Sequence, residues 1–142
     1  MKQIRNFGDE RQIAQCTYCE CDTPTRDHVP SRVLLDEPYP EDLPVVPTCH
    51  KCNEGFSVDE EYVACLIDCV ISGTVSPEKV QRDKIRRILT NKPALTARLT
   101  WACKEESGAV RFSVEDSRVK NVVLKLGRGH ALFELNEPQY ED

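Results

Sequence analysis

Four cysteines form two Cys-x-x-Cys pairs in the first part of the chain, Cys16 with Cys19 and Cys49 with Cys52. Each pair places two thiolates on one tight turn, and two pairs supply the four ligands of a tetrahedral zinc site. The 29 residues 20–48 separate the pairs, so one ion would join two distant segments. We therefore predict a structural zinc ion (Zn2+) on these four cysteines, supplying folding energy to this half of the chain.

The other cysteines leave two interpretations open. Cys65 and Cys69 lie one helical turn apart, and together with Cys103 they could chelate a second ion. The first two also fall on an apolar helical stripe, where buried cysteine is a common core residue, and we favour this second interpretation. Cys21, two residues past Cys19, could compete as a ligand, and we favour a free thiol beside the zinc site.

Polar residues suited to hydrolysis lie between and just after the cysteine pairs. Asp27 precedes His28, and Asn53 directly follows the last cysteine. A neutral imidazole can take a proton from water near pH 7, and carboxylate and amide oxygens suit a hard divalent cation. Arg26 and Arg32 flank the pair and are candidate phosphate-binding residues. The alternative is a structural strand-end histidine bonded to backbone, with its aspartate as a turn acceptor.

This order of motifs over residues 16–60 resembles the HNH endonuclease family, whose ββα-metal site sits on a zinc-bound scaffold of the four-cysteine type. The resemblance implies that Asp27 and Asn53 bind a catalytic ion, Mg2+ or Mn2+, and that His28 is the general base. A later segment, residues 125–131, is similar to a stretch that follows the HNH unit in some bacterial members.

The chain departs from the family pattern at one position. The middle asparagine of the motif is missing, because Pro44 or Asp42 stands where it is expected. A proline has no polar side chain, and an ionised aspartate cannot donate a hydrogen bond. The contact that orients the histidine-bearing loop must therefore be made by other groups.

Charge is unevenly distributed along the chain. Residues 1–60 carry 6 Lys/Arg and 12 Asp/Glu, whereas residues 79–128 carry 13 Lys/Arg and 5 Asp/Glu, although the whole chain has a formal net charge of −5. A polyanion responds to the local field, so the basic half favours a nucleic-acid partner, with Arg82 and Arg86 as candidate phosphate contacts. An ordinary solvated helix face is the alternative. Trp101 and Phe112 are expected in the core, which gives no support for stacking on single strands.

The pattern of apolar residues predicts how these groups are positioned. We expect an α+β fold with a zinc-stapled ββα-metal core over residues 16–60, and a mainly helical extension with a short strand over residues 61–142. The whole chain, residues 1–142, is expected to be a single domain. The second cysteine pair should open a helix, and Ser57 with Glu60 has the pattern of a capping box.

Turn residues mark the remaining boundaries. Ser72-Gly73 should end the first helix, and Pro77 should begin another. A strand is expected near residues 110–114. A last helix should start at residue 116 or 117, with Gly127 and Gly129 loosening its end.

We therefore expect a metal-dependent endonuclease that acts on nucleic acid, with DNA as the favoured substrate. The alternative is a catalytically weak or inactive zinc-bound module on the same scaffold that binds nucleic acid or protein. No apolar run approaches the ~20 residues of a membrane span, and no secretion signal is evident, so we expect a cytoplasmic protein without membrane contact. A homodimer is an open alternative for its assembly.

Overall fold

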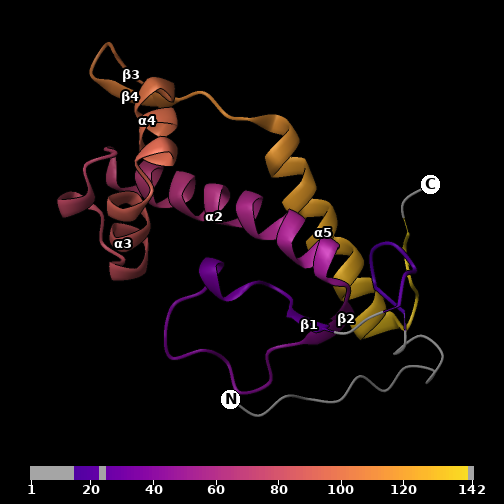
Figure 1. Cartoon of the computed structure of the whole chain (residues 1–142). Coiled ribbons are helices and arrows are strands. Elements are labelled where there is room, and N and C mark those ends of the chain that lie inside the picture. The colour runs from indigo at the N-terminus through magenta and orange to yellow at the C-terminus, as the bar shows by residue number, and fades with distance from the viewer. Residues whose placement is uncertain (1–14, 23–24, 141–142) are drawn as a thin grey trace.

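The structure, a computed structural model, describes residues 15–22 and 25–140. Within these residues the protein is mixed α/β, with four α-helices and two separate two-stranded antiparallel sheets (Figure 1). This agrees with the predicted α+β class. The elements in chain order are β1 (Thr25–His28), the 3-10 turn η1 (Arg32–Leu34), β2 (Val45–Thr48), α2 (His50–Ser72), the 3-10 turn η2 (Pro77–Lys79), α3 (Asp83–Asn91), α4 (Pro93–Ala102), β3 (Cys103–Glu106), β4 (Ala109–Phe112) and α5 (Asp116–Leu135).

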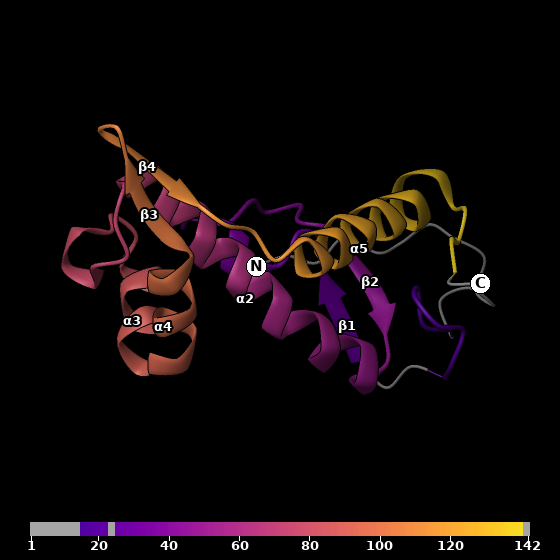
Figure 2. The same ribbon diagram turned by 90° about the horizontal axis from the view of Figure 1, so that it is seen from above.

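Helix α2 connects the two ends of the molecule. Figures 1 and 2 show the β1–β2 hairpin and the C-terminal half of α5 at one end of α2, and α3, α4 and the β3–β4 hairpin at the other. Helix α5 packs along α2, and each end has its own apolar cluster. The cluster beside the β1–β2 hairpin contains Cys16, Tyr18, Val29, Val46, Cys49, Phe56 and Leu132.

Helix α2 begins earlier than the capping-box pattern predicted. Cys49 is its N-cap residue, and the Cys49 sulfur accepts a hydrogen bond from the backbone N–H of Cys52. Ser57 lies inside the helix, where its hydroxyl donates to the carbonyl of Glu54 at 3.0 Å. The capping box was therefore wrong, whereas the expectation that the second cysteine pair opens a helix is confirmed. The helix ends as predicted at Gly73, whose φ of 64° suits glycine.

Two further predictions of local structure were only partly correct. Pro77 begins the short turn η2, and the following α-helix starts later, at Asp83. The predicted strand is found as β4, but its partner β3 was missed, because exposed Lys and Glu residues have low strand propensity. Ser107 and Gly108, both with positive φ, form the tight turn between the two strands.

Trp101 was wrongly placed in the core. Its side chain is 86% exposed on α4, whereas Leu99 two residues earlier is buried. Helix α4 is only ten residues long and covers the core with a narrow stripe, so the bulky indole falls on its outer face. Phe112 on β4 is half-buried and packs against the core, as expected.

Helix α5 is continuous, so the expectation that Gly127 and Gly129 loosen its end was wrong. Gly129 instead lets the helix approach the segment after β1. A Cβ atom on Gly129 would lie 2.7 Å from Cγ2 of Val29, closer than real Cβ contacts, and 3.3 Å from the hydroxyl of Tyr18. Tertiary packing therefore stabilises the helix through a residue with poor helix propensity.

We expect Gly129→Ala to destabilise the protein by about 1–3 kcal/mol, because the added methyl group overpacks this contact. Gly127→Ala is the matched control, since nothing lies within 4 Å of a Cβ atom at that position. That change should be neutral or stabilising by up to about 1 kcal/mol through helix propensity. Urea unfolding of both variants measures the difference, and equal stabilities would contradict the close approach of α5 to Val29.

Candidate functional site

The four predicted zinc ligands converge on one point. Their sulfur atoms all lie within 4.8 Å of one another, and the sulfurs of Cys19 and Cys49 are 3.6 Å apart. Zinc–sulfur bonds of about 2.3 Å in a tetrahedron place sulfurs about 3.8 Å apart, so the cluster can close around one ion. The prediction that these four cysteines form one cluster is confirmed, and the cluster is compatible with a structural zinc site, for which four cysteines are a usual ligand set.

Local hydrogen bonds bring the two cysteine pairs close together. The first pair lies on a turn in which the N–H of Cys16 donates to the carbonyl of Cys21 at 2.7 Å. Thr17 then joins this turn to β2, because both its N–H and its hydroxyl donate to the carbonyl of Pro47, at 3.0 and 2.7 Å. The second pair occupies the start of α2. Cys21 itself is exposed and is not among the four clustered cysteines.

Burial and backbone hydrogen bonds shift the pKa values of these thiols in opposite directions. The pKa of Cys49 is lowered to about 7, chiefly by the backbone amide of Cys52. Burial is the largest effect on Cys16 and Cys52, and it raises the pKa of both. A coordinated metal ion deprotonates its thiol ligands, so an ion would supply the positive charge that these buried sulfurs need.

The remaining cysteines belong to the core. Cys65 and Cys69 are fully buried on α2, and burial raises their pKa to about 12 and 11. Among the described residues, they form no metal-binding group with Cys103. Cys65 and Cys69 lie in the larger apolar cluster, which confirms the favoured interpretation of them as core residues.

The β1–β2 hairpin carries the Asp-His pair next to the cysteine cluster. Asp27 pairs with Val46 and His28 with Val45 in antiparallel register, and β2 leads through Cys49 into α2. Beyond the hairpin, the N–H of Val29 donates to the carbonyl of Pro44 at 3.0 Å. This main-chain hydrogen bond holds the segment after His28 beside Pro44. Pro44 is one of the two residues that stand where the family pattern has its middle asparagine.

Asp27 belongs to a buried charge network. Its side chain packs towards the helices, and the residue is 8% exposed. The ammonium of Lys125 from α5 lies 2.5 Å from its Oδ2 and also bonds to Oε1 of Glu60 from α2. Lys125 is 0% and Glu60 3% exposed. Burial raises the pKa of Glu60, and the positive charge of Lys125 opposes this effect.

Tyr18 adds a buried hydroxyl group to this region. The hydroxyl of Tyr18 is buried without a hydrogen-bond partner among the described residues. Its pKa is raised by burial and then by the negative charges of Asp27 and Glu60. The Oδ2 atom of Asp27 makes no hydrogen bond within the described residues, and its contact there is the ion pair with the Lys125 ammonium at 2.5 Å.

His28 is half-buried at the end of β1 and contacts Arg32. Its Nε2 atom lies 3.2 Å from the guanidinium of Arg32, so Nε2 accepts this bond and Nδ1 carries the proton. Burial lowers the pKa of His28, the charges of Arg32 and Lys125 lower it further, and Asp27 opposes them. The imidazole is therefore neutral at pH 7, the form that accepts a proton.

The structure places Asn53 on the same face of α2 as the charge network. Asn53, Phe56 and Glu60 follow at intervals of three and four residues, and the Lys125 ammonium lies 5.5 Å from the Phe56 ring centre. Asn53 thus shares a helix face with Glu60, seven residues further along α2, and no hydrogen bond within the described residues joins its side chain to Asp27.

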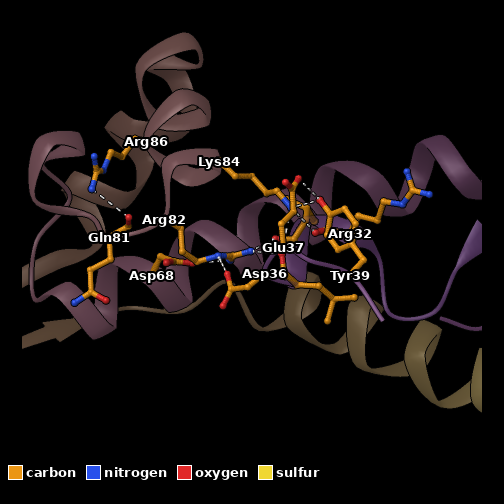
Figure 3. Close-up of polar contacts among 11 residues, drawn as sticks. Arg32, Asp36, Glu37, Tyr39, Asp68, Gln81, Arg82, Lys84 and Arg86 are labelled. Carbon is orange, nitrogen blue, oxygen red and sulfur yellow. Dashed lines mark hydrogen bonds and ion pairs between the residues drawn. The ribbon is translucent and has the colours of Figure 1, made fainter. Parts of the chain in front are cut away.

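The predicted phosphate-binding arginines lie in different surroundings. Arg26 and Arg32 are exposed on and beside the hairpin, and Arg32 also stacks over Tyr39 at 5.5 Å. Arg82 and Arg86 are engaged within the fold (Figure 3). Arg86 binds the carbonyls of Val80 and Gln81 and the carboxylate of Asp83.

Arg82 ties the loop after η1 to α2. Its guanidinium donates to the carbonyls of Val33 and Leu35, at 3.1 and 2.7 Å, and to the buried carboxylate of Asp68, at 2.9 Å. Its Nε also lies 2.6 Å from exposed Asp36. These contacts occupy the N–H donors of Arg82 that would otherwise bind a substrate phosphate.

Sequence reasoning missed Lys125 and Glu60 as members of the site. A signal was present, because Lys125 lies on the apolar stripe of α5 formed by Val122, Gly129 and Leu132 at helical spacing. A lysine in such a stripe is almost never fully buried unless it is paired. The identity of its partners required the packing of α5 against β1 and α2.

No family model matches the chain, and neither curated proteins nor solved structures yield a match. Among the described residues, no helix combines the length and apolarity needed to cross a membrane. The chemistry of the site must therefore be argued from its own residues.

Proposed function

We propose that this chain is a zinc-bound, metal-dependent endonuclease of the HNH type that hydrolyses phosphodiester bonds in DNA. The observation that carries the proposal is the hairpin–helix unit, in which the strand bearing Asp27 and His28 pairs with the strand that leads into the cysteine cluster and Asn53. Zinc held by four thiolates has no open position, so its role is structural. Hydrolysis then depends on the Asp-His pair.

The donor set near the hairpin suits a second, catalytic ion. The carboxylate of Asp27 and the amide oxygen of Asn53 are both ligand types that Mg2+ and Mn2+ accept. Such an ion, when bound, neutralises charge on the phosphate and the leaving oxygen. The remaining ligand positions belong to phosphate and water.

His28 would take the proton of the attacking water at Nε2. In the absence of substrate this atom accepts a hydrogen bond from Arg32. A phosphate oxygen is a stronger acceptor for guanidinium than a neutral imidazole, so substrate would draw Arg32 away and free the lone pair. Arg32 then contributes both phosphate binding and release of the base, and exposed Arg26 lies on β1 with His28.

One observation favours the alternative, a zinc-bound binding module without catalysis. Asp27 and His28 are both paired, to Lys125 and Arg32, and neither contact needs a metal ion or substrate. In that case the charge network serves only to attach α5. Such a module would still bind DNA or protein through its exposed basic residues.

Cleavage of supercoiled plasmid in Mg2+, Mn2+ or Ni2+ separates the two functions. We expect the wild type to nick DNA with at least one of these ions, and His28→Ala to be slower by about 100-fold, because a general base is lost. His50→Ala is the matched control, since His50 is exposed at the start of α2 and should leave the rate unchanged.

Zinc content and the unfolding midpoint should be equal in all three proteins. A wild type that cuts no faster than His28→Ala with any ion would rule out the nuclease. Retained DNA binding in a gel-shift assay would then identify the binding module.

A further inference from the structure

The most unusual group in the molecule is the buried ammonium of Lys125. It lies 2.5 Å from Asp27 Oδ2, bonds to Glu60, and faces the Phe56 ring at 5.5 Å. Three elements supply its surroundings: β1, α2 and α5. A buried charge carries a large desolvation cost, which its partners must offset.

We propose that Lys125 is a positioning residue that fixes the carboxylate of Asp27 and weakens its hold on the divalent ion, so that α5 sets the metal affinity of the site. This inference rests on the proposed function, because it takes Asp27 as a ligand of that ion. It assigns to α5 a role in the reaction although α5 carries none of the predicted catalytic residues.

The charges of the network support this role. Two carboxylates share one ammonium, so the network has a net charge of −1 when both acids are ionised. A divalent ion bound to Asp27 would be repelled by the adjacent ammonium and attracted by Glu60. The ammonium also holds one oxygen of Asp27 in place, which orients the carboxylate beside His28.

Removal of the ammonium should therefore change affinity and rate in opposite directions. Without Lys125, an ion held by Asp27 would no longer be repelled by a neighbouring ammonium and would bind more tightly. Asp27 loses its fixed orientation, and cleavage becomes slower. A lysine that only stabilised the fold would lower affinity and rate together.

The experiment compares Lys125→Met with Lys120→Met in the full chain loaded with zinc. Lys120 is exposed on the same helix and has no partner among the described residues, so the two changes are chemically matched. Mn2+ binding is measured without DNA by electron paramagnetic resonance, and plasmid cleavage is measured at saturating Mn2+. We expect Lys125→Met to bind Mn2+ about tenfold more tightly, because the positive charge that repels the divalent ion is removed.

Lys125→Met should at the same time cleave about tenfold more slowly. The Lys120→Met control should match the wild type in both measurements. Affinity and rate that both stay at wild-type values, or that both fall in a folded protein, would overturn the positioning role.

Glu60→Gln provides a second test in case Lys125→Met does not fold. This variant keeps the ammonium but removes one of its two acids, so Mn2+ binding should weaken several-fold. An unchanged Mn2+ affinity in folded Glu60→Gln would also overturn the inference.

Asp27→Asn separates this inference from the function on which it rests. A wild type that binds Mn2+ no better than Asp27→Asn, and cuts no faster, means that the proposed function has failed. A wild type that binds Mn2+ and cuts DNA, with Lys125→Met indistinguishable from it, means that only the role of Lys125 has failed.

Discussion

Removal of the metal from the four-cysteine cluster is expected to unfold the end of the molecule that contains the β1–β2 hairpin. A structural zinc ion contributes an apparent binding free energy of about 10–16 kcal/mol, which becomes folding free energy when the site forms only in the folded chain. The apolar cluster there is small and includes Cys16 and Cys49 themselves. Packing alone is therefore insufficient to hold the first turn against β2 and the start of α2.

Cys52→Ser tests this expectation without a chelator. We expect loss of zinc from the purified protein and loss of dispersed amide NMR signals from residues 15–22 and 25–56. Cys21→Ser is the matched control, because Cys21 is an exposed cysteine outside the cluster. It should retain one zinc ion per chain and the wild-type spectrum. Zinc retention in Cys52→Ser, or equal damage in Cys21→Ser, would contradict the assignment of the four ligands.

Arg82→Met is expected to lower the free energy of unfolding by about 3–5 kcal/mol, because it leaves a buried carboxylate without its partner. Asp68 is 5% exposed, and the guanidinium of Arg82 bonds to it at 2.9 Å. The change also removes the donors to the Val33 and Leu35 carbonyls, which hold the loop after η1 (Figure 3). The exposed contact with Asp36 contributes little.

Urea unfolding with zinc present measures this loss, and two further variants locate its cause. Arg87→Met removes an exposed arginine of α3, the helix that Arg82 precedes, and should change stability by no more than about 0.5 kcal/mol. In the double variant Arg82→Met with Asp68→Leu, no buried charge remains, and most of the stability should return. A double variant as unstable as Arg82→Met alone would show that the buried carboxylate is not the cause.

Local sequence patterns predicted some helix boundaries correctly and others wrongly. Gly73 was correctly predicted as the end of α2. A helix often ends in a residue with left-handed backbone conformation, which glycine adopts without strain, so the signal lies in the residue itself. Ser57 was wrongly taken as a start, because the pattern of a hydroxyl followed by a glutamate also occurs inside helices. The actual cap is Cys49, whose sulfur accepts a backbone hydrogen bond that the usual cap residues do not predict.

Exposure was harder to predict than element type. Both Trp101 and Lys125 lie within helices, yet the tryptophan is exposed and the lysine buried, opposite to what their side chains suggest. Hydrophobicity describes an average preference, whereas the position of a residue on its helix face determines what it contacts. Arg82 illustrates the same limit, since its charge predicted a phosphate contact and the fold provides four internal acceptors.

The sequence by itself determined the cysteine cluster, the class of fold and the placement of the Asp-His pair on a strand beside that cluster. These features depend on residue spacing within short segments, which local geometry converts directly into structure. Only the tertiary structure decided that Lys125 lies between Asp27 and Glu60, the latter 65 residues away in the chain. Such a contact depends on how closely α5 approaches β1, which is set by Gly129 against Val29 and by the joint packing of several elements.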